Sequence, residues 1–183
     1  MTVKAAFVLL ALAGWATYAI GAGAVELAQA EAPRPADPGA AEFKQSLEQA
    51  RAAEKAGDHR RAIALYEQAL AAAEKLHGAD HPDAAGVLNI LANLHVRTGE
   101  HGKALPLYQR SLAIYEKVLG PEHAAVAVSL TNIGNLYRRG GEHAKAAPFY
   151  ERSLAIHEKS LGPAHATTAA ALLNLATAYR EMG

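Results

Sequence analysis

The sequence predicts an all-α fold in which similar helix pairs stack along one axis, an α-solenoid. The main observation is a period of 42 residues, shown by Tyr66, Tyr108 and Tyr150. Other positions keep the same interval: Leu70, Leu112 and Leu154; Gly57, Gly99 and Gly141; His81, His123 and His165. A fixed period of about 20–50 residues is typical of stacked repeats. From residue 42 onward the apolar residues follow helical spacing, and no segment alternates like a strand.

Glycine and proline divide this region into helices. Gly57, Gly99 and Gly141 mark tight turns where glycine can adopt the left-handed conformation. Three longer loops each combine a glycine that ends one helix with a proline near the start of the next. The expected helices cover residues 42–56, 59–77, 82–98, 102–119, 123–139, 143–161 and 165–182. They form three pairs followed by one unpaired helix.

The second helix of each pair carries the residues expected to form the core. In the middle repeat these share one helix face: Ala104, Leu107, Tyr108, Ser111 and Leu112. The small alanine of this set permits close approach of a neighbouring helix, and the tyrosine supplies about 150–250 Å² of buried surface. We therefore assign the repeated tyrosines to the core and not to a cofactor-binding aromatic box.

The repeat also resembles a known family. The segment Leu130–Tyr137, followed by Gly141, Ala146, Tyr150 and Ser153, is similar to the tetratricopeptide repeat signature. The loop Leu119–His123 and the 42-residue length are similar to the kinesin-light-chain type of this repeat. The resemblance covers residues 42–183. It implies a right-handed α-solenoid of antiparallel helix pairs that acts as a non-catalytic scaffold for protein–protein interaction.

Both ends of the repeat region depart from the pattern. Helix 42–56 lacks the Leu-Asn type of core, which suits an N-terminal capping repeat. The last helix keeps an apolar face around Leu172 and Tyr179, although no partner helix follows it. The alternative function is therefore a self-assembling structural module of the cell envelope, a homo-oligomer formed through this uncapped helix.

The N-terminal segment predicts export. Lys4 precedes an uncharged run from Ala5 to Val25, and cleavage sites of small residues end at Ala24 and Ala30. Residues 1–24 are thus a signal peptide or, alternatively, an uncleaved membrane anchor. Residues 31–41 contain three prolines and form a linker. The repeat domain is expected in the periplasm or secreted, or anchored to a membrane and facing away from the cytoplasm.

Composition excludes several other classes. Lysine plus arginine equal aspartate plus glutamate at 18 each, so no large field attracts nucleic acid. The absence of cysteine excludes disulfides, thiolate nucleophiles and cysteine-based zinc sites. Equivalent histidines of successive repeats lie too far apart to converge on one ion at about 2 Å. No nucleophile or phosphate-binding motif occurs either. The sequence thus predicts no catalytic residues, no metal and no cofactor.

The resemblance directs attention to the first helix of each pair, because these helices line the peptide-binding concave surface in the family. Asparagine can bond a partner's backbone through its donor and its acceptor, and arginine can bind a carboxylate. Lysines of the family's carboxylate clamp are replaced by Asn89, Thr131 and Ala170. The alternative for the asparagines and arginines on these helices is that they are ordinary polar residues on a solvated face. The predicted groove residues are Asn93, Arg97, Asn132, Asn135, Arg138, Arg139, Asn174 and Arg180.

Overall fold

A computed structural model describes residues 38–183 of the chain. The signal peptide or anchor, both cleavage sites and residues 31–37 of the linker lie outside this described part. Within it, none of the helices is both long enough and apolar enough to cross a membrane. The helices are α2 (Pro38–Lys55), α3 (His59–His77), α4 (Pro82–Arg97), α5 (His101–Leu119), α6 (Ala124–Arg139), α7 (His143–Leu161) and α8 (Ala166–Met182).

The first helix begins earlier than expected. We predicted its start at residue 42 and a linker reaching residue 41, but α2 begins at Pro38. Proline is favourable at the first helical position, since its missing N–H would have no partner there and its φ already suits a helix. The added turn brings Phe43 into the body of the helix, where it packs against the core together with Leu47.

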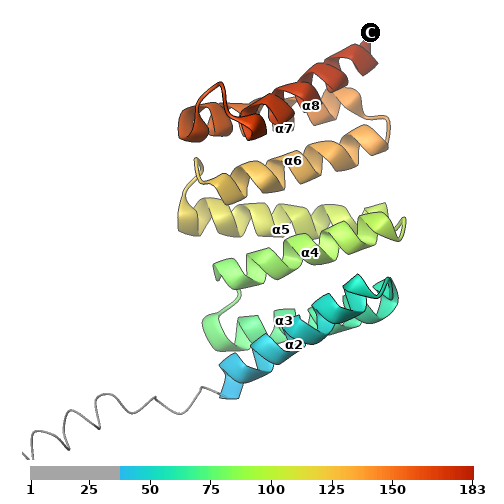
Figure 1. Cartoon of the computed structure of the whole chain (residues 1–183), viewed down its shortest axis with the longest axis vertical. Coiled ribbons are helices and arrows are strands. Elements are labelled where there is room, and N and C mark those ends of the chain that lie inside the picture. The colour runs from blue at the N-terminus through green and yellow to red at the C-terminus, as the bar shows by residue number, and fades with distance from the viewer. Residues whose placement is uncertain (1–37) are drawn as a thin grey trace, which may run out of the picture. The chain divides into compact units, whose positions relative to one another are not determined.

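The helices stack in chain order from α2 to α8 (Figure 1). Successive helices pack against one another, and α4 also contacts α6 directly. This contact between the first helices of two neighbouring pairs places them on a shared side of the stack. No strand occurs among residues 38–183, and the predicted all-α solenoid is confirmed.

The repeated tyrosines and alanines form the core, as predicted. Tyr66, Tyr108 and Tyr150 are only 1%, 2% and 1% exposed. The alanines at the close helix contacts, Ala62, Ala104 and Ala146, are fully buried. Because each tyrosine lies between helices of its own and neighbouring repeats, the same packing unit recurs along the stack.

The turns within the pairs take the predicted conformation. Gly57, Gly99 and Gly141 have φ values of 77°, 80° and 76°. An L-residue in this left-handed region would be strained, so glycine is required for the sharp reversal.

Histidines start three of the helices, which the sequence did not predict. His81, His123 and His165 each precede a first-of-pair helix and have extended backbone conformations. In each, Nδ1 accepts a hydrogen bond from the backbone N–H two residues later, at 3.2, 3.1 and 3.2 Å. The histidine ring thus replaces the usual serine or aspartate cap and satisfies an otherwise unpaired donor.

Candidate functional site

Five of the eight predicted groove residues lie around one pocket. The pocket has a volume of about 180 Å³ and is formed by α4, α5 and α6. Its lining residues are Asn93, Val96, Tyr108, Asn132, Asn135, Leu136, Arg138 and Arg139. None of these eight side chains is acidic.

Two core tyrosines orient the asparagines of this region. The Tyr108 hydroxyl donates to Oδ1 of Asn93 at 2.6 Å, and the Tyr150 hydroxyl donates to Oδ1 of Asn135 at 2.7 Å. Burial raises the pKa of Tyr108 to about 12, against the opposing charge of Arg139. Its hydroxyl therefore keeps its proton at neutral pH. Since the tyrosines use the amide oxygens, both asparagines present their Nδ2 donors.

Asn132 holds two first-of-pair helices together. Its Nδ2 donates to Oδ1 of Asn89 on α4 at 3.1 Å, and Asn89 in turn donates to Ser111 and Ser129. Ser111 donates to the backbone oxygen of Ala85, which closes the network inside the protein. One N–H of Asn132 is therefore used within the protein, and its second N–H and its oxygen are left for a partner.

The two adjacent arginines differ in their surroundings. Arg138 is partly buried, and its Nη1 lies 3.8 Å from Oε1 of Glu181 on α8. Arg139 is exposed, and no ion pair holds it within residues 38–183. Together with the two asparagine Nδ2 groups, these guanidinium groups make the pocket rich in donors. Such a pocket suits a carboxylate or a series of backbone carbonyl oxygens.

The other three predicted residues lie elsewhere. Nη1 of Arg97 donates to Oε1 of Glu54 at 3.1 Å, and the Tyr66 hydroxyl donates to the second oxygen of the same carboxylate. Arg97 lines a separate cavity of about 640 Å³ that also contains Glu67, Glu100 and Lys103. Arg180 is exposed on α8 and is not among the residues that line these cavities.

Asn174 lies in a second pocket of about 180 Å³ between α6, α7 and α8. Asn132 lines both this pocket and the first one. The two pockets thus adjoin through Asn132, and we call the surface that they form on α4, α6 and α8 the asparagine groove.

Sequence reasoning missed two groups in this groove. Tyr108 was assigned only to the core because of its period, yet it lines the first pocket. His157 lines the second pocket, is 6% exposed, and has a buried Nδ1 with no hydrogen-bond partner among the described residues. Burial, and then the nearby His165, lower the pKa of His157. The sequence does mark His157 as a departure from the repeat, because the equivalent position one repeat earlier holds Tyr115.

Comparison with protein families identifies this architecture. The family model for the tetratricopeptide repeat matches residues 45–117, 83–159 and 141–183, which together extend from within α2 to the end of α8. The chain is a tetratricopeptide-repeat protein. Repeats of this family generally mediate protein–protein interaction, and the fold is typically a non-catalytic scaffold.

Solved structures of kinesin-light-chain type resemble the repeat protein. BtubC (BKLC) from P. vanneervenii matches with a TM-score of 0.74 and 24% identity, over 86% of this chain and 62% of that chain. Another match is a protein of Podosopora anserina with nearly identical TPR-like repeats, assigned as a kinesin light chain. It has a TM-score of 0.68 and 28% identity, over 86% of this chain and 73% of that chain.

A more distant match is the N-terminal domain of stress-induced protein-1 from C. elegans. It has a TM-score of 0.59 and 11% identity, over 81% of this chain and 100% of that chain. No curated protein sequence matches the repeat protein. The repeat protein spans less than two thirds of BtubC, and at these identities the C. elegans and P. vanneervenii structures support the fold alone.

Proposed function

We propose that the repeat protein is a scaffold that binds an extended, acidic segment of a partner protein in the asparagine groove. The observation that carries this proposal is the donor-rich first pocket, in which Asn93, Asn135, Arg138 and Arg139 meet without any acidic residue in the lining. In this arrangement a carboxylate of the partner contacts the arginines, and the asparagine Nδ2 groups bond its backbone oxygens.

Preorganisation makes such binding effective. The hydroxyls of Tyr108 and Tyr150 fix the two asparagine amides before a partner arrives. The cost of ordering these side chains is then met during folding and not during binding. A pocket of about 180 Å³ is too small for a whole ligand of drug size. It suits one side chain of a longer segment that follows the groove.

Arg139 offers the sharpest test, because it is exposed and its removal breaks no ion pair among the described residues. Fluorescently labelled ten-residue peptides, with and without acidic residues, would be titrated with the wild type and with Arg139→Gln. The acidic peptides should bind the wild type better. The variant should bind them about tenfold or more weakly, since a hydrogen bond to a charged group is worth about 1.5–3 kcal/mol.

A matched control is Arg61→Gln, which removes an exposed arginine from α3 that does not line the pocket. It should leave the affinity for the acidic peptides unchanged. Equal losses in both variants would show that overall charge is responsible, and an unchanged affinity in Arg139→Gln would reject the groove as the binding site.

A second candidate function is self-assembly through α8. Leu172, Leu173 and Tyr179 are 55%, 67% and 47% exposed on this helix, which packs on one side only among the described residues. Sedimentation velocity over a wide concentration range would reveal the assembly. A strictly monomeric species at the highest concentration would reject it.

We also propose that the protein works outside the cytoplasm, on the basis of its N-terminal sequence. Intact mass spectrometry of the native protein should find an N-terminus after Ala24 or Ala30. An uncleaved chain in the membrane fraction would favour the anchor, and an uncleaved cytoplasmic chain would reject export.

A further inference from the structure

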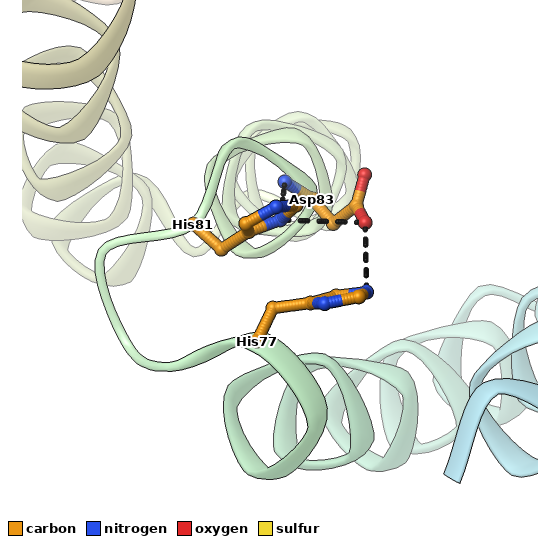
Figure 2. A group of neighbouring side chains, drawn as sticks. All are labelled: His77, His81 and Asp83. Carbon is orange, nitrogen blue, oxygen red and sulfur yellow. Dashed lines mark hydrogen bonds and ion pairs between the residues drawn. The ribbon is translucent and has the colours of Figure 1, made fainter. Parts of the chain in front are cut away.

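Three side chains with metal-binding groups meet at the junction between the first two repeats. His77 is the last residue of α3, His81 precedes α4, and Asp83 lies in the first turn of α4 (Figure 2). Nε2 of His77 is 3.5 Å from Oδ2 of Asp83, and Nδ1 of His81 is 3.4 Å from the same oxygen. One ligand atom from each residue can be chosen so that all three lie within 4.8 Å of one another.

Two of these residues do not belong to the repeat pattern. The positions equivalent to His77 hold Leu119 and Leu161, and those equivalent to Asp83 hold Ala125 and Thr167. His81 does follow the pattern, and its role as a helix cap is shared with His123 and His165. Capping therefore explains His81, whereas His77 and Asp83 pair with each other at this junction and have no counterparts in the later repeats.

We propose that His77, His81 and Asp83 bind a divalent transition-metal ion of the zinc class. Imidazole nitrogen and carboxylate oxygen are ligands that zinc accepts, and three protein ligands with a water molecule complete a tetrahedral site. Ligands about 2.0–2.1 Å from a tetrahedral ion lie about 3.3–3.4 Å from each other. The two nitrogen-to-oxygen distances, 3.5 and 3.4 Å, are already close to this spacing.

Binding requires a small rearrangement of the rings. The imidazoles of His77 and His81 stack with their centroids 4.2 Å apart and their planes inclined by 24°. Rotation of the His77 side chain, which is 36% exposed, can turn its Nε2 toward a shared ion. In the structure without an ion, Nδ1 of His81 accepts a hydrogen bond from the backbone N–H of Asp83 at 3.2 Å. This hydrogen bond is lost when Nδ1 binds the metal. The free energy of metal binding must therefore exceed the stability lost with this one helix cap.

The carboxylate of Asp83 supplies the negative charge of the cluster. The other carboxylate of the loop, Asp80, is paired with Lys117 at 2.5 Å, and Arg110 donates to the backbone oxygen of Ala79, so the loop adds no net negative charge to that of Asp83. An ion bound here would fasten the end of α3 to the start of α4 and stiffen the first junction between repeats.

The repeat itself supplies the test variants. His77→Leu and Asp83→Ala install residues that the second repeat already carries at these positions, so both should fold. His81→Ser removes the imidazole and keeps a capping oxygen. His123→Ala removes an equivalent cap that has no metal partners and serves as the control.

The full chain without an affinity tag would be titrated with Zn²⁺ by calorimetry, and with Co²⁺ while its visible absorption is recorded. The wild type and His123→Ala should bind one equivalent, with the intense Co²⁺ bands of a four-coordinate site. His77→Leu, Asp83→Ala and His81→Ser should each bind about tenfold or more weakly, the size of effect seen even for second-shell changes. Zn²⁺ should raise the melting temperature of the wild type and not of His77→Leu.

Absence of saturable binding to the wild type, or equal affinity in His77→Leu and the wild type, would overturn the proposal. Equal losses of metal affinity in His123→Ala and His81→Ser would also overturn it, because the loss of a helix cap alone would then account for the weaker binding. None of these three results depends on the asparagine groove, so the proposed peptide-binding function is tested separately.

Discussion

At the scale of single residues, the repeated tyrosine joins the core to the asparagine groove. The 42-residue period predicted that the rings of Tyr66, Tyr108 and Tyr150 are buried, and this is confirmed. The period could not predict the hydroxyl partners, because these change along the stack. Tyr66 donates to Glu54, whereas Tyr108 and Tyr150 donate to Asn93 and Asn135.

Tyr150→Phe should separate the two roles of this residue. The variant keeps the buried ring and loses the 2.7 Å bond to Asn135. Its free energy of unfolding in urea should fall by about 0.5–1.5 kcal/mol, the usual net value of one hydrogen bond. Tyr150→Ala, which also empties the core, should lose about 3–5 kcal/mol if it folds at all. Equal losses in the two variants would contradict this division.

His157 should make stability depend on pH. Burial lowers its pKa in the folded protein, so the unfolded chain binds the proton more readily. As pH falls from 7.5 through the ordinary histidine value of about 6.5, the folded state should therefore lose stability. His157→Gln should show a smaller loss between pH 7.5 and 5.5 in urea unfolding curves.

The two proteins differ only at residue 157, so the difference between the two curves isolates His157. Parallel curves would mean that burial does not disfavour the charged ring.

The residue packed beside this position also differs between the repeats, in step with the change from Tyr115 to His157. The Tyr115 hydroxyl lies 3.4 Å from the site of a Cβ on Gly86, and Val128 holds the equivalent position beside His157.

At the scale of helices, sequence patterns predicted most bounds closely, but they missed the start of α2 and the contacts between stacked helices. The start of α2 was wrong because proline density was interpreted only as a linker signal, although proline also suits a first helical turn. Ion pairs between successive second-of-pair helices were not predicted either. Arg110 and Glu74 pair at 2.7 Å, and the equivalent Arg152 and Glu116 pair at 2.5 Å. The paired residues are 36 positions apart in the sequence and come close only when the helices stack, so the sequence pattern does not predict the pair.

The starts of the second-of-pair helices offer a prediction from within the repeat. Asp58 caps α3 by accepting from the N–H of Arg61 at 3.1 Å, whereas Glu100 and Glu142 at equivalent positions form no such bond. Their longer side chains bind lysine instead. Hydrogen bonds from Lys103 and then His95 lower the pKa of Glu100 to about 2.

Glu142→Asp should therefore stabilise the protein. The shorter side chain can reach the cap position, which is worth about 0.5–2 kcal/mol, and the exposed pair with Lys145 contributes less. Urea unfolding should show a higher midpoint with an unchanged slope. Asp58→Glu is the reverse change and should lower the midpoint; a fall in Glu142→Asp would mean that the lysine pair outweighs the cap.

At the scale of the whole molecule, each helix depends on its neighbours in the stack. Eight residues of α4 and seven of α6 are buried, compared with two of α2 and three of α8. The two end helices pack on one side only among the described residues. In a linear array of this kind, stability is roughly a sum of nearest-neighbour contributions, so the ends open first.

Hydrogen exchange followed by mass spectrometry should show this gradient. Amides of α8 and α2 should exchange fastest and those of α4 and α6 slowest, because opening an interior helix breaks contacts on both sides. Uniform protection would mean that the stack unfolds as one unit.

The same measurement tests whether copies of the chain assemble through the apolar face of α8, where Leu172 and Leu173 are exposed. If copies of the chain assemble there, protection of α8 alone must rise with protein concentration while α2 is unchanged. A profile that does not depend on concentration would reject self-assembly through α8, and it would leave open whether the first pocket, on α4, α5 and α6, binds a partner.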